Sequence, residues 1–357
     1  MYSVRLAFLL FGIALANSAS AAAIGIVAPQ GGPYEMLGTQ IRQGAKIAAA
    51  KLGLDVVEIH ESCEPGSGGA IADGLVAGKV SVAIGFLCTE TLNDALPTLK
   101  DANIPAITLS SRAPILMEDA IKRNWPLFRM APSDKAESDV IADIILRDWQ
   151  GNTFGLIDDG TIHSRELVDR IRSRIEQNGL KPTFTDTLRP AQEQQIALVR
   201  RLSRTNISRV FVSAERNDVA IVARDAASEN IPLIIMGADT MNAANRPVLM
   251  QEGVLAVTLP DYASLPSAAP AIQELRSADI EPDGYVLPSY AATELAARLV
   301  ALVQQEEKPA AELLLGNRFE TSIGSIGFNQ NHELSENPYR LQRWNGTSFG
   351  IVPSAGE

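Results

Sequence analysis

Residues 80–109 read VSVAIGFLCTETLNDALPTLKDANIPAITL and hold one complete unit of an alternating α/β chain. Val80–Gly85 is an apolar run, Leu92–Ala102 has apolar residues at helical spacing, and Ala106–Leu109 is apolar again. Short apolar runs separated by a helix of ten or more residues are typical of parallel strands that are buried on both faces. The segment therefore predicts a βαβ unit.

The same alternation continues outward from this segment. Further strand-like runs are Ile24–Ala28, Leu54–Ile59, Thr153–Ile157, Val210–Ser213 and Leu233–Met236. Helical patterns occur at Gln40–Lys51, Ala136–Trp149, Ser164–Gln177, Gln192–Leu202 and Asp218–Glu229. Polar connections near Ala131 and Pro260 divide the alternation into two series, and about 335 residues exceed what one core usually supports. The expected fold class is α/β, with two doubly wound parallel-sheet lobes.

The N-terminus has the features of a secretory signal. Arg5 precedes the apolar run Leu6–Ala16, and small residues follow it. A cation, a short apolar stretch and an A-x-A site predict a signal peptide over residues 1–23, cleaved near Ala21 to Ala23. A membrane anchor is the alternative, but this run is shorter than the ~20 residues of a spanning helix. No later segment is expected to span a bilayer.

The charge balance argues against a nucleic-acid partner. The chain has 31 Lys and Arg against 42 Asp and Glu, a formal net charge of -11. Cleavage would remove Arg5 and leave 30 cations, so the net charge would become -12. An acidic chain without a basic stripe repels nucleic acid and anionic membrane surfaces.

No motif for catalysis, a cofactor or a metal is visible. The loop Ala28-Pro29-Gln30-Gly31-Gly32-Pro33 is neither G-x-G-x-x-G nor a P-loop, and its prolines oppose a phosphate-binding helix start. The G-x-S-x-G string at residues 346–350 has no histidine after it, which a hydrolase of that type needs. His60, His163 and His332 lie far apart and share no metal-ligand spacing. We therefore expect no enzyme, no cofactor and no metal site.

The chain has two cysteines, Cys63 and Cys88. In an exported protein an even pair predicts one disulfide, and two buried thiols are the alternative. Two lobes without reaction chemistry suit a hinge-bending binding protein. Ligands of open α/β sheets bind outside the carboxyl ends of the strands, and a few connecting residues are enough for a hinge.

Two short segments carry a resemblance to a known family. Glu61-Ser62-Cys63-Glu64-Pro65 and Ile84-Gly85-Phe86-Leu87-Cys88-Thr89 are similar to a Cys-Asp-Pro-like turn and a Gly-x-Leu-Cys-Ser strand end. Weaker support comes from residues 107–114, 158–160 and 236–239. On these segments the chain resembles the leucine/isoleucine/valine-binding family of periplasmic substrate-binding proteins of ABC importers. The resemblance runs from Ile24 to about Phe349 and implies the type I periplasmic-binding fold with a three-segment hinge.

The resemblance also implies an organisation and a role. One lobe would contain residues 24–130 and 260–325, and the other residues 131–259 and 326–357, with a disulfide between Cys63 and Cys88 in the first. The protein would be a periplasmic monomer that captures an amino acid or similar small carboxylate by hinge closure. It would deliver this ligand to a membrane permease. The alternative is a periplasmic sensing module that reports its ligand to a receptor or regulator.

The family's binding residues carry over to both predicted lobes. Thr89 stands where the family has a hydroxyl that binds the ligand carboxylate, at a helix N-terminus that suits an anion. Ser110 and Arg112 occupy the next loop, and Asp239 replaces a glutamate that pairs with the ligand ammonium. For Thr89 the alternative is a plain N-cap, and for Asp239 it is an aspartate in a surface turn.

Other positions depart from the family pattern. Leu37, His163 and Glu215 replace aromatic side chains of the family's pocket, whereas Tyr285 is expected to retain an aromatic wall. Arg112 and Glu215 either pair with each other or bind a polar part of the ligand. The resemblance therefore implies an α-amino acid or similar carboxylate without specifying leucine, isoleucine or valine. We expect Arg112 and Asp239 to bind a zwitterionic ligand from opposite lobes.

Overall fold

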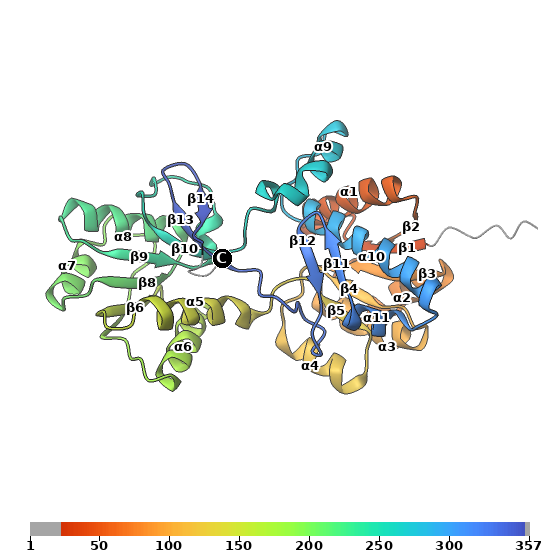
Figure 1. Cartoon of the computed structure of the whole chain (residues 1–357), viewed down its shortest axis with the longest axis horizontal. Helices are drawn as coiled ribbons and strands as arrows, with labels where there is room; N and C mark the ends of the chain where they lie inside the picture. The colour runs from red at the N-terminus through yellow and green to blue at the C-terminus, as the bar shows by residue number, and fades with distance from the viewer. Residues whose placement is uncertain (1–22, 354–357) are drawn as a thin grey trace, which may run out of the picture.

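The structure is a computed structural model that describes residues 23–353, and its two large sheets lie in separate halves (Figure 1). Residues 1–22 of the predicted signal lie outside the described residues, and Ala23 already belongs to the first strand. The first sheet has the strand order β2-β1-β3-β4-β5, with every pair parallel. Its strands are β1 (Ala23–Ala28), β2 (Asp55–His60), β3 (Val80–Gly85), β4 (Ala106–Thr108) and β5 (Leu127–Arg129).

Helices cover both faces of the first sheet. The face with Ile26 and Ile84 packs against α1, α10 and α11, and the face with Val27 and Ala83 packs against α2, α3 and α4. Successive strand residues point to opposite faces, so both faces are apolar. These helices are α1 (Glu35–Leu52), α2 (Gly68–Ala77), α3 (Thr89–Asp101), α4 (Pro114–Arg123), α10 (Val286–Glu306) and α11 (Ala310–Gly316). The same half holds the 3-10 helices η1 (Gly32–Tyr34), η3 (Tyr262–Ser264) and η4 (Pro266–Ala268), α9 (Ala269–Ser277) and the hairpin β11 (Arg318–Thr321) and β12 (Gly324–Gly327).

The second sheet is mixed and has the order β14-β13-β10-β9-β8-β6-β7. Its strands are β6 (Phe154–Asp158), β7 (Phe184–Thr187), β8 (Arg209–Ser213), β9 (Ile234–Gly237), β10 (Leu255–Thr258), β13 (Arg340–Trp344) and β14 (Phe349–Ile351). β6 to β10 pair in parallel, and β13 and β14 are added antiparallel. The helices are α5 (Asp134–Asp148), α6 (Ile162–Gln177), α7 (Ile196–Arg204), α8 (Arg216–Ser228) and the 3-10 helix η2 (Asp239–Asn242).

Three segments join the halves, and we call this region (residues 130–133, 259–261 and 328–339) the waist. The first and third segments lie side by side. The Arg129 N–H donates to the His332 carbonyl at 3.0 Å, the Phe128 ring stacks on the His332 imidazole, and Arg129 forms an ion pair with Glu333. The first and third connections are thus tied to one another.

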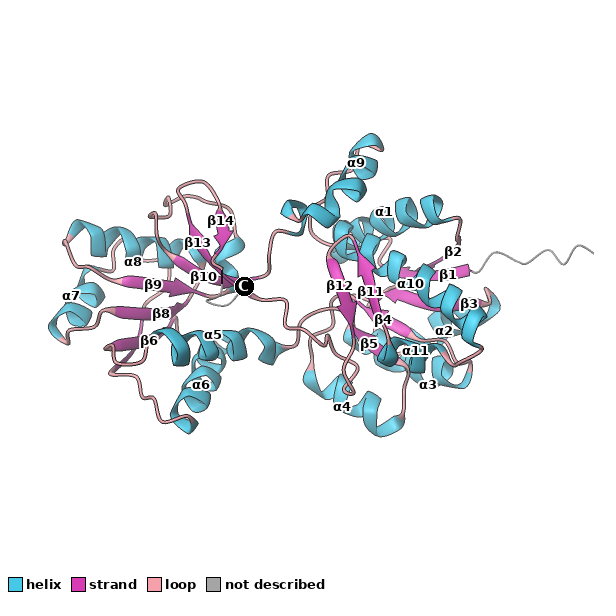
Figure 2. Cartoon of the chain, viewed as in Figure 1, coloured by secondary structure: helices cyan, strands magenta, loops and turns pink. Residues whose placement is uncertain are grey.

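The carboxyl ends of both sheets point to the waist. β5 leads directly into the first connection, and all strands of the first sheet are parallel to β5. β10 leads into the second connection, and β6, β8 and β9 are parallel to β10. The strand arrows in Figure 2 follow this arrangement. The loops after these strands therefore face the opposite half, as the predicted α/β class with two doubly wound sheets requires.

Some elements were not predicted, among them β7, α2, α4 and α11. β7 is an edge strand with alternating polar residues, so it lacks the continuous apolar run of the buried strands. α2 contains three glycines, which lower helix propensity, but a Cβ at Gly68 would lie 2.2 Å from the Thr91 carbonyl oxygen of α3. α4 occupies part of the segment expected to be a polar loop after Leu109.

The expectation that no segment after the leader could span a bilayer is wrong on length and composition. α10 is apolar and long enough, but 61% of its most apolar window is buried, and it packs against α1 and the first sheet. It is the core helix of the first half.

The predicted disulfide between Cys63 and Cys88 is confirmed. Their Cα atoms are 5.3 Å apart, and no cysteine of the described residues is free. The bond joins the loop after β2 to the end of the loop after β3, because Cys88 directly precedes α3. The alternative of two buried thiols is wrong.

Candidate functional site

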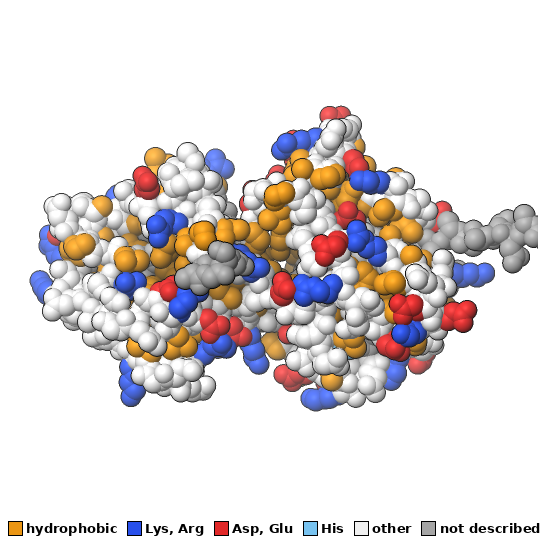
Figure 3. All heavy atoms as spheres, in the orientation of Figure 1, with side chains coloured by type: hydrophobic (Ala, Val, Ile, Leu, Met, Phe, Trp, Pro, Cys, Tyr) orange, Lys and Arg blue, Asp and Glu red, His pale blue; other side chains and the backbone are white. Residues whose placement is uncertain are grey.

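The predicted site residues come from both sides of the waist. Thr89 follows β3, and Ser110 and Arg112 follow β4 in the first half. In the second half the predicted residues follow β6, β8 and β9, namely His163, Glu215 and Asp239. Tyr285 directly precedes α10. The space-filling view shows the surface narrowed and hollowed between the two halves (Figure 3).

Thr89 lies in a polar corner at the start of α3. Its hydroxyl is 2.8 Å from the buried hydroxyl of Ser111, and the Ser110 hydroxyl donates to the Leu87 carbonyl at 3.3 Å. Cys88, not Thr89, occupies the N-cap position, so the plain N-cap interpretation is wrong. The first backbone N–H groups of a helix have no helical partner, so this end of α3 can donate to an anion.

Arg112 reaches across the waist. Its Nη1 donates to the Tyr339 hydroxyl at 3.4 Å, and Tyr339 directly precedes β13 of the other half. Partial burial lowers the pKa of Arg112, but Tyr339, Asp239 and Tyr285 outweigh this and raise it, so the guanidinium remains charged. The ion pairs of residues 23–353 do not include one between Arg112 and Glu215.

Asp239 is half-buried at the start of η2, which excludes an exposed surface turn. Its Oδ1 accepts from the Leu259 N–H at 3.1 Å, so its carboxylate fixes the start of the second connection. Its own N–H donates to Oε1 of Glu137 at 2.7 Å. A second carboxylate therefore lies directly behind Asp239.

Glu137 is buried, and burial raises its pKa to about 7. The N–H of Asp239 opposes this increase, the charge of Asp239 adds to it, and the charge of Arg112 opposes it. Burial also raises the pKa of Tyr262 to about 12, and it raises the pKa of Tyr339. The second half thus presents the carboxylates of Glu137 and Asp239 and the Tyr339 hydroxyl to the guanidinium of Arg112. Tyr262 of the first half also lies within electrostatic range of Arg112.

We expect Glu137 to make the protein less stable as the pH rises. Its folded pKa is about 7 against an ordinary 4.5, so its contribution is full below about pH 4.5 and is lost as the pH rises towards 7. Glu137→Gln keeps the acceptor for Asp239 and should relieve about 3 kcal/mol of this loss. Urea unfolding of both proteins at pH 4.5 and pH 7.5 measures it. A difference between them that does not change with pH would contradict the assignment.

The remaining predicted residues make fewer contacts. His163 and Glu215 are exposed at the starts of α6 and α8. Tyr285 is half-buried against the first core, and its N–H donates to Oε1 of Gln40 at 3.2 Å. Asp239 and Tyr285 both lie within electrostatic range of Arg112, whereas His163 and Glu215 are exposed and, within residues 23–353, form no ion pair with it.

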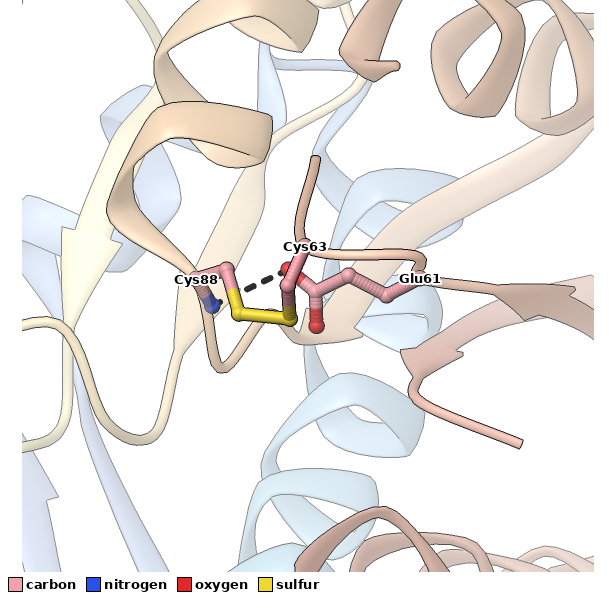
Figure 4. Close-up of side chains that lie close together, drawn as sticks. All are labelled: Glu61, Cys63 and Cys88. Atoms are coloured by element: carbon pink, nitrogen blue, oxygen red, sulfur yellow. Dashed lines mark hydrogen bonds between the residues drawn. A yellow bond between two sulfur atoms is a disulfide. The ribbon is translucent and has the colours of Figure 1, made fainter. Parts of the chain in front are cut away.

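Sequence reasoning missed Glu61 and Glu137. Glu137 lies four and eight residues before the buried Ile141 and Ile145, so it interrupts the apolar stripe of α5, and this was a usable signal. Glu61 follows a strand directly and lies beside the disulfide (Figure 4). Arg112 and Tyr339 lie 227 positions apart in the sequence, and no feature of the sequence predicts their contact.

Glu61 and the two sulfur atoms lie close enough together for a metal site. Both sulfurs are used in the disulfide, however, and metal ligation by cysteine requires a thiolate. This group therefore does not fit a metal.

Hollows in the described residues lie at the waist and elsewhere. One of about 200 Å³ lies between the second and third connections, and Tyr262, Asn337 and Arg340 are among its lining residues. Another of about 690 Å³ lies beside α8, and no predicted site residue lines it. We place the candidate site by the strand ends, because the opening between separated halves is not an enclosed hollow.

Two doubly wound halves with polar loops facing each other across three connections define a two-lobed binding protein. The sequence profile of the periplasmic binding protein family matches residues 22–348. The chain therefore belongs to the periplasmic binding protein family, and it has the type I periplasmic-binding fold.

Relatives and solved structures agree with this membership. The leucine-, isoleucine-, valine-, threonine- and alanine-binding protein of Pseudomonas aeruginosa is 22% identical over 335 residues, which cover 90% of this chain and 89% of that protein. A crystal structure of a candidate branched-chain amino acid ABC transporter from Rhodospirillum rubrum has a TM-score of 0.80 at 15% identity and covers 93% of this chain and 100% of that one. A solute-binding protein of an ABC transporter from R. palustris, in complex with benzoate, has a TM-score of 0.61 at 15% identity, with 93% and 95% covered.

Proposed function

We propose that this chain is the extracytoplasmic solute-binding component of an ABC importer and captures a small carboxylate between its two lobes. The observation that carries the proposal is that loops from both sheets bring polar residues to one waist. Thr89 and Arg112 supply donors from one side, and Asp239 supplies a carboxylate from the other. The names of the relatives, which are binding proteins, support the same role.

The lobes follow the two sheets. We assign residues 24–130 and 260–328 to one lobe and residues 131–259 with β13 and β14 to the other. The third crossing belongs after Phe328 and not at 325, because Ile326 and Phe328 pack in the first core. Hinge motion would then be limited to the waist, where a few residues change conformation.

Large exposed apolar side chains at the opening support closure. Met36 is 71% exposed near the start of α1, Ile115 is 59% exposed near the start of α4, and Ile162 is 79% exposed at the start of α6. These helices follow strands whose carboxyl ends point to the waist. Bringing the lobes together would remove such surface from water, which favours the closed state.

The charges at the waist suit a ligand with a carboxylate and a second polar group. Thr89 and the N-terminus of α3 are proposed to bind the carboxylate. Arg112 and Asp239 would contact further polar groups of the ligand from opposite lobes, which fits an amino acid better than a purely apolar acid. Because His163 and Glu215 are polar where the resemblance implies aromatic walls, leucine, isoleucine and valine are not singled out.

The remaining parts of the proposal follow from this role. The chain would act as a periplasmic monomer after cleavage of its signal peptide near Ala21 to Ala23, and it would deliver its ligand to a membrane permease. It would perform no reaction of its own and would need no cofactor.

A thermal-shift screen tests the ligand class. Amino acids and small carboxylates would be compared with their amides, which keep the shape and lose the negative charge. A carboxylate present at about 100 times its dissociation constant should stabilise the protein by about 2.7 kcal/mol. If no carboxylate raises the melting temperature and a sugar or nucleoside does, the role proposed for Thr89 is wrong.

A further inference from the structure

The turn that follows β2 contacts two neighbouring loops, the loop after β1 and the loop after β3, and both face the waist. β2 is the edge strand of the first sheet, so the residues after it can lie across the ends of β1 and β3. His60 Nδ1 accepts from the Gln30 N–H of the loop after β1 at 3.0 Å. Glu61 and Cys63 both contact the loop after β3.

Glu61 makes the most specific of these contacts. Its side chain is fully buried, and its Oε2 accepts from the N–H of Leu87 at 2.8 Å. Its Oε1 accepts from the N–H of Cys88 at 3.1 Å (Figure 4). The carboxylate thereby fixes the orientation of two consecutive peptide groups directly before Thr89. The disulfide fixes only the side chain of Cys88. The carbonyl oxygens of the same two peptide groups accept from the hydroxyls of Thr108 and Ser110, so Glu61 holds their N–H ends.

The loop that Glu61 holds is strained. Phe86 has φ 58°, a left-handed conformation that is unfavourable for a bulky residue, and it persists only where the surroundings enforce it. A Cβ at Gly85 would lie 2.1 Å from the Val27 carbonyl oxygen, so the chain also passes unusually close to β1. Without the two acceptor oxygens of Glu61, this loop would have fewer constraints against relaxing.

The buried carboxylate of Glu61 is unfavourable for the stability of the folded protein. Burial raises its pKa to about 7, although the N–H groups of Leu87 and Cys88 oppose the increase. A buried carboxylate is usually less favourable for folding than a neutral or apolar group of the same size. Groups that oppose stability in this way are commonly retained where function requires them.

We infer that Glu61 is a positioning residue for the ligand site, which orients the hydroxyl of Thr89 and the first N–H groups of α3 towards the waist. Glu61 accepts from the N–H groups of Leu87 and Cys88, so these two groups cannot donate to a ligand. The first N–H groups of α3 then remain as the backbone donors available to an anion. This inference rests on the proposed contact between Thr89 and the ligand carboxylate.

Glu61→Gln tests it, because glutamine keeps the size and one acceptor oxygen but places an NH₂ group against the other N–H. Asp94→Asn is the control. Asp94 lies in α3, and its Oδ2 accepts at 2.7 Å from the N–H of Gly66, which belongs to the same loop as Glu61. In the part of the chain that the structure describes, Asp94 has no hydrogen bond to Leu87 or Cys88. Hydrogen exchange in the peptide that spans residues 86–91, followed by mass spectrometry without ligand, reports on the held loop. Calorimetry with L-leucine and with benzoate reports on binding.

Glu61→Gln should unfold in urea at pH 7.5 at no lower concentration than the parent, yet exchange faster in this peptide and bind the probe about tenfold more weakly. Asp94→Asn should match the parent in both exchange and binding. Loss of folding in Glu61→Gln, or exchange equal to that of Asp94→Asn, would overturn the inference. If the parent binds neither probe, the ligand found in the thermal-shift screen takes their place. The exchange comparison decides the role of Glu61 in either case, and only a screen without any carboxylate hit makes the proposed ligand class fail.

Discussion

Replacing Cys63 and Cys88 together by serine should lower the free energy of unfolding by about 3–4 kcal/mol. The disulfide joins residues 25 positions apart, so in the oxidised protein it restricts the unfolded chain within that loop. Serine keeps the size of each side chain, and the N–H of residue 88 can still donate to Glu61. Urea unfolding of the variant and the parent at one pH measures the difference.

Reduction gives an independent control for this prediction. The parent treated with a reductant should unfold at the same urea concentration as the double serine variant, because both lack the covalent link. The unreduced, denatured parent should contain no titratable thiol. Two thiols per chain, or a variant as stable as the oxidised parent, would contradict a structural disulfide.

The second large effect concerns binding: Arg112→Ala and Asp239→Ala should each weaken affinity for the ligand found in the screen by well over about tenfold. Removing one partner of a desolvated charge pair typically costs about 2–5 kcal/mol. Arg112 already reaches the other lobe through Tyr339, and Asp239 lies within its electrostatic range. A ligand that satisfies both charges would favour the closed state, and such differential affinity is what shifts an open–closed balance.

Controls separate charge from local structure. Asp239 Oδ1 accepts from the Leu259 N–H, and Asp239→Asn keeps that acceptor, so it removes only the charge. Arg200 pairs with Glu229 in the second half, and Arg200→Ala should bind like the parent. Calorimetry compares the dissociation constants. Parent-like affinity in both Arg112→Ala and Asp239→Ala would mean that specificity lies elsewhere in the opening.

Much of the fold was predictable because its strands are buried on both faces. Val80–Gly85 and Val210–Ser213 are mostly apolar and mostly buried runs, and the strand pairing places their carboxyl ends at the waist. β7 escaped prediction because an edge strand needs only one apolar face. α2 was not predicted because its close packing on α3 requires glycine at position 68, and glycine has a low helix propensity.

The site was predictable only in outline. The loops after the strands could be located, and the family resemblance singled out Thr89, Arg112 and Asp239 in these loops as expected ligand-binding residues. Their partners could not be, because Tyr339 and Glu137 come from remote segments that only the three connections bring near. Glu137 could have been noticed in the sequence as a carboxylate at the spacing of the apolar residues of α5, whereas no sequence pattern marks the hydroxyl of Tyr339.

Small-angle X-ray scattering with and without the ligand found in the screen tests the central claim most directly. The account holds that the ligand binds between two lobes and draws them together about the waist. A saturating ligand should therefore reduce the radius of gyration of the parent, and should reduce it less in Asp239→Asn at the same concentration. Tight binding with an unchanged radius of gyration would show that the ligand occupies one lobe alone and would contradict the account.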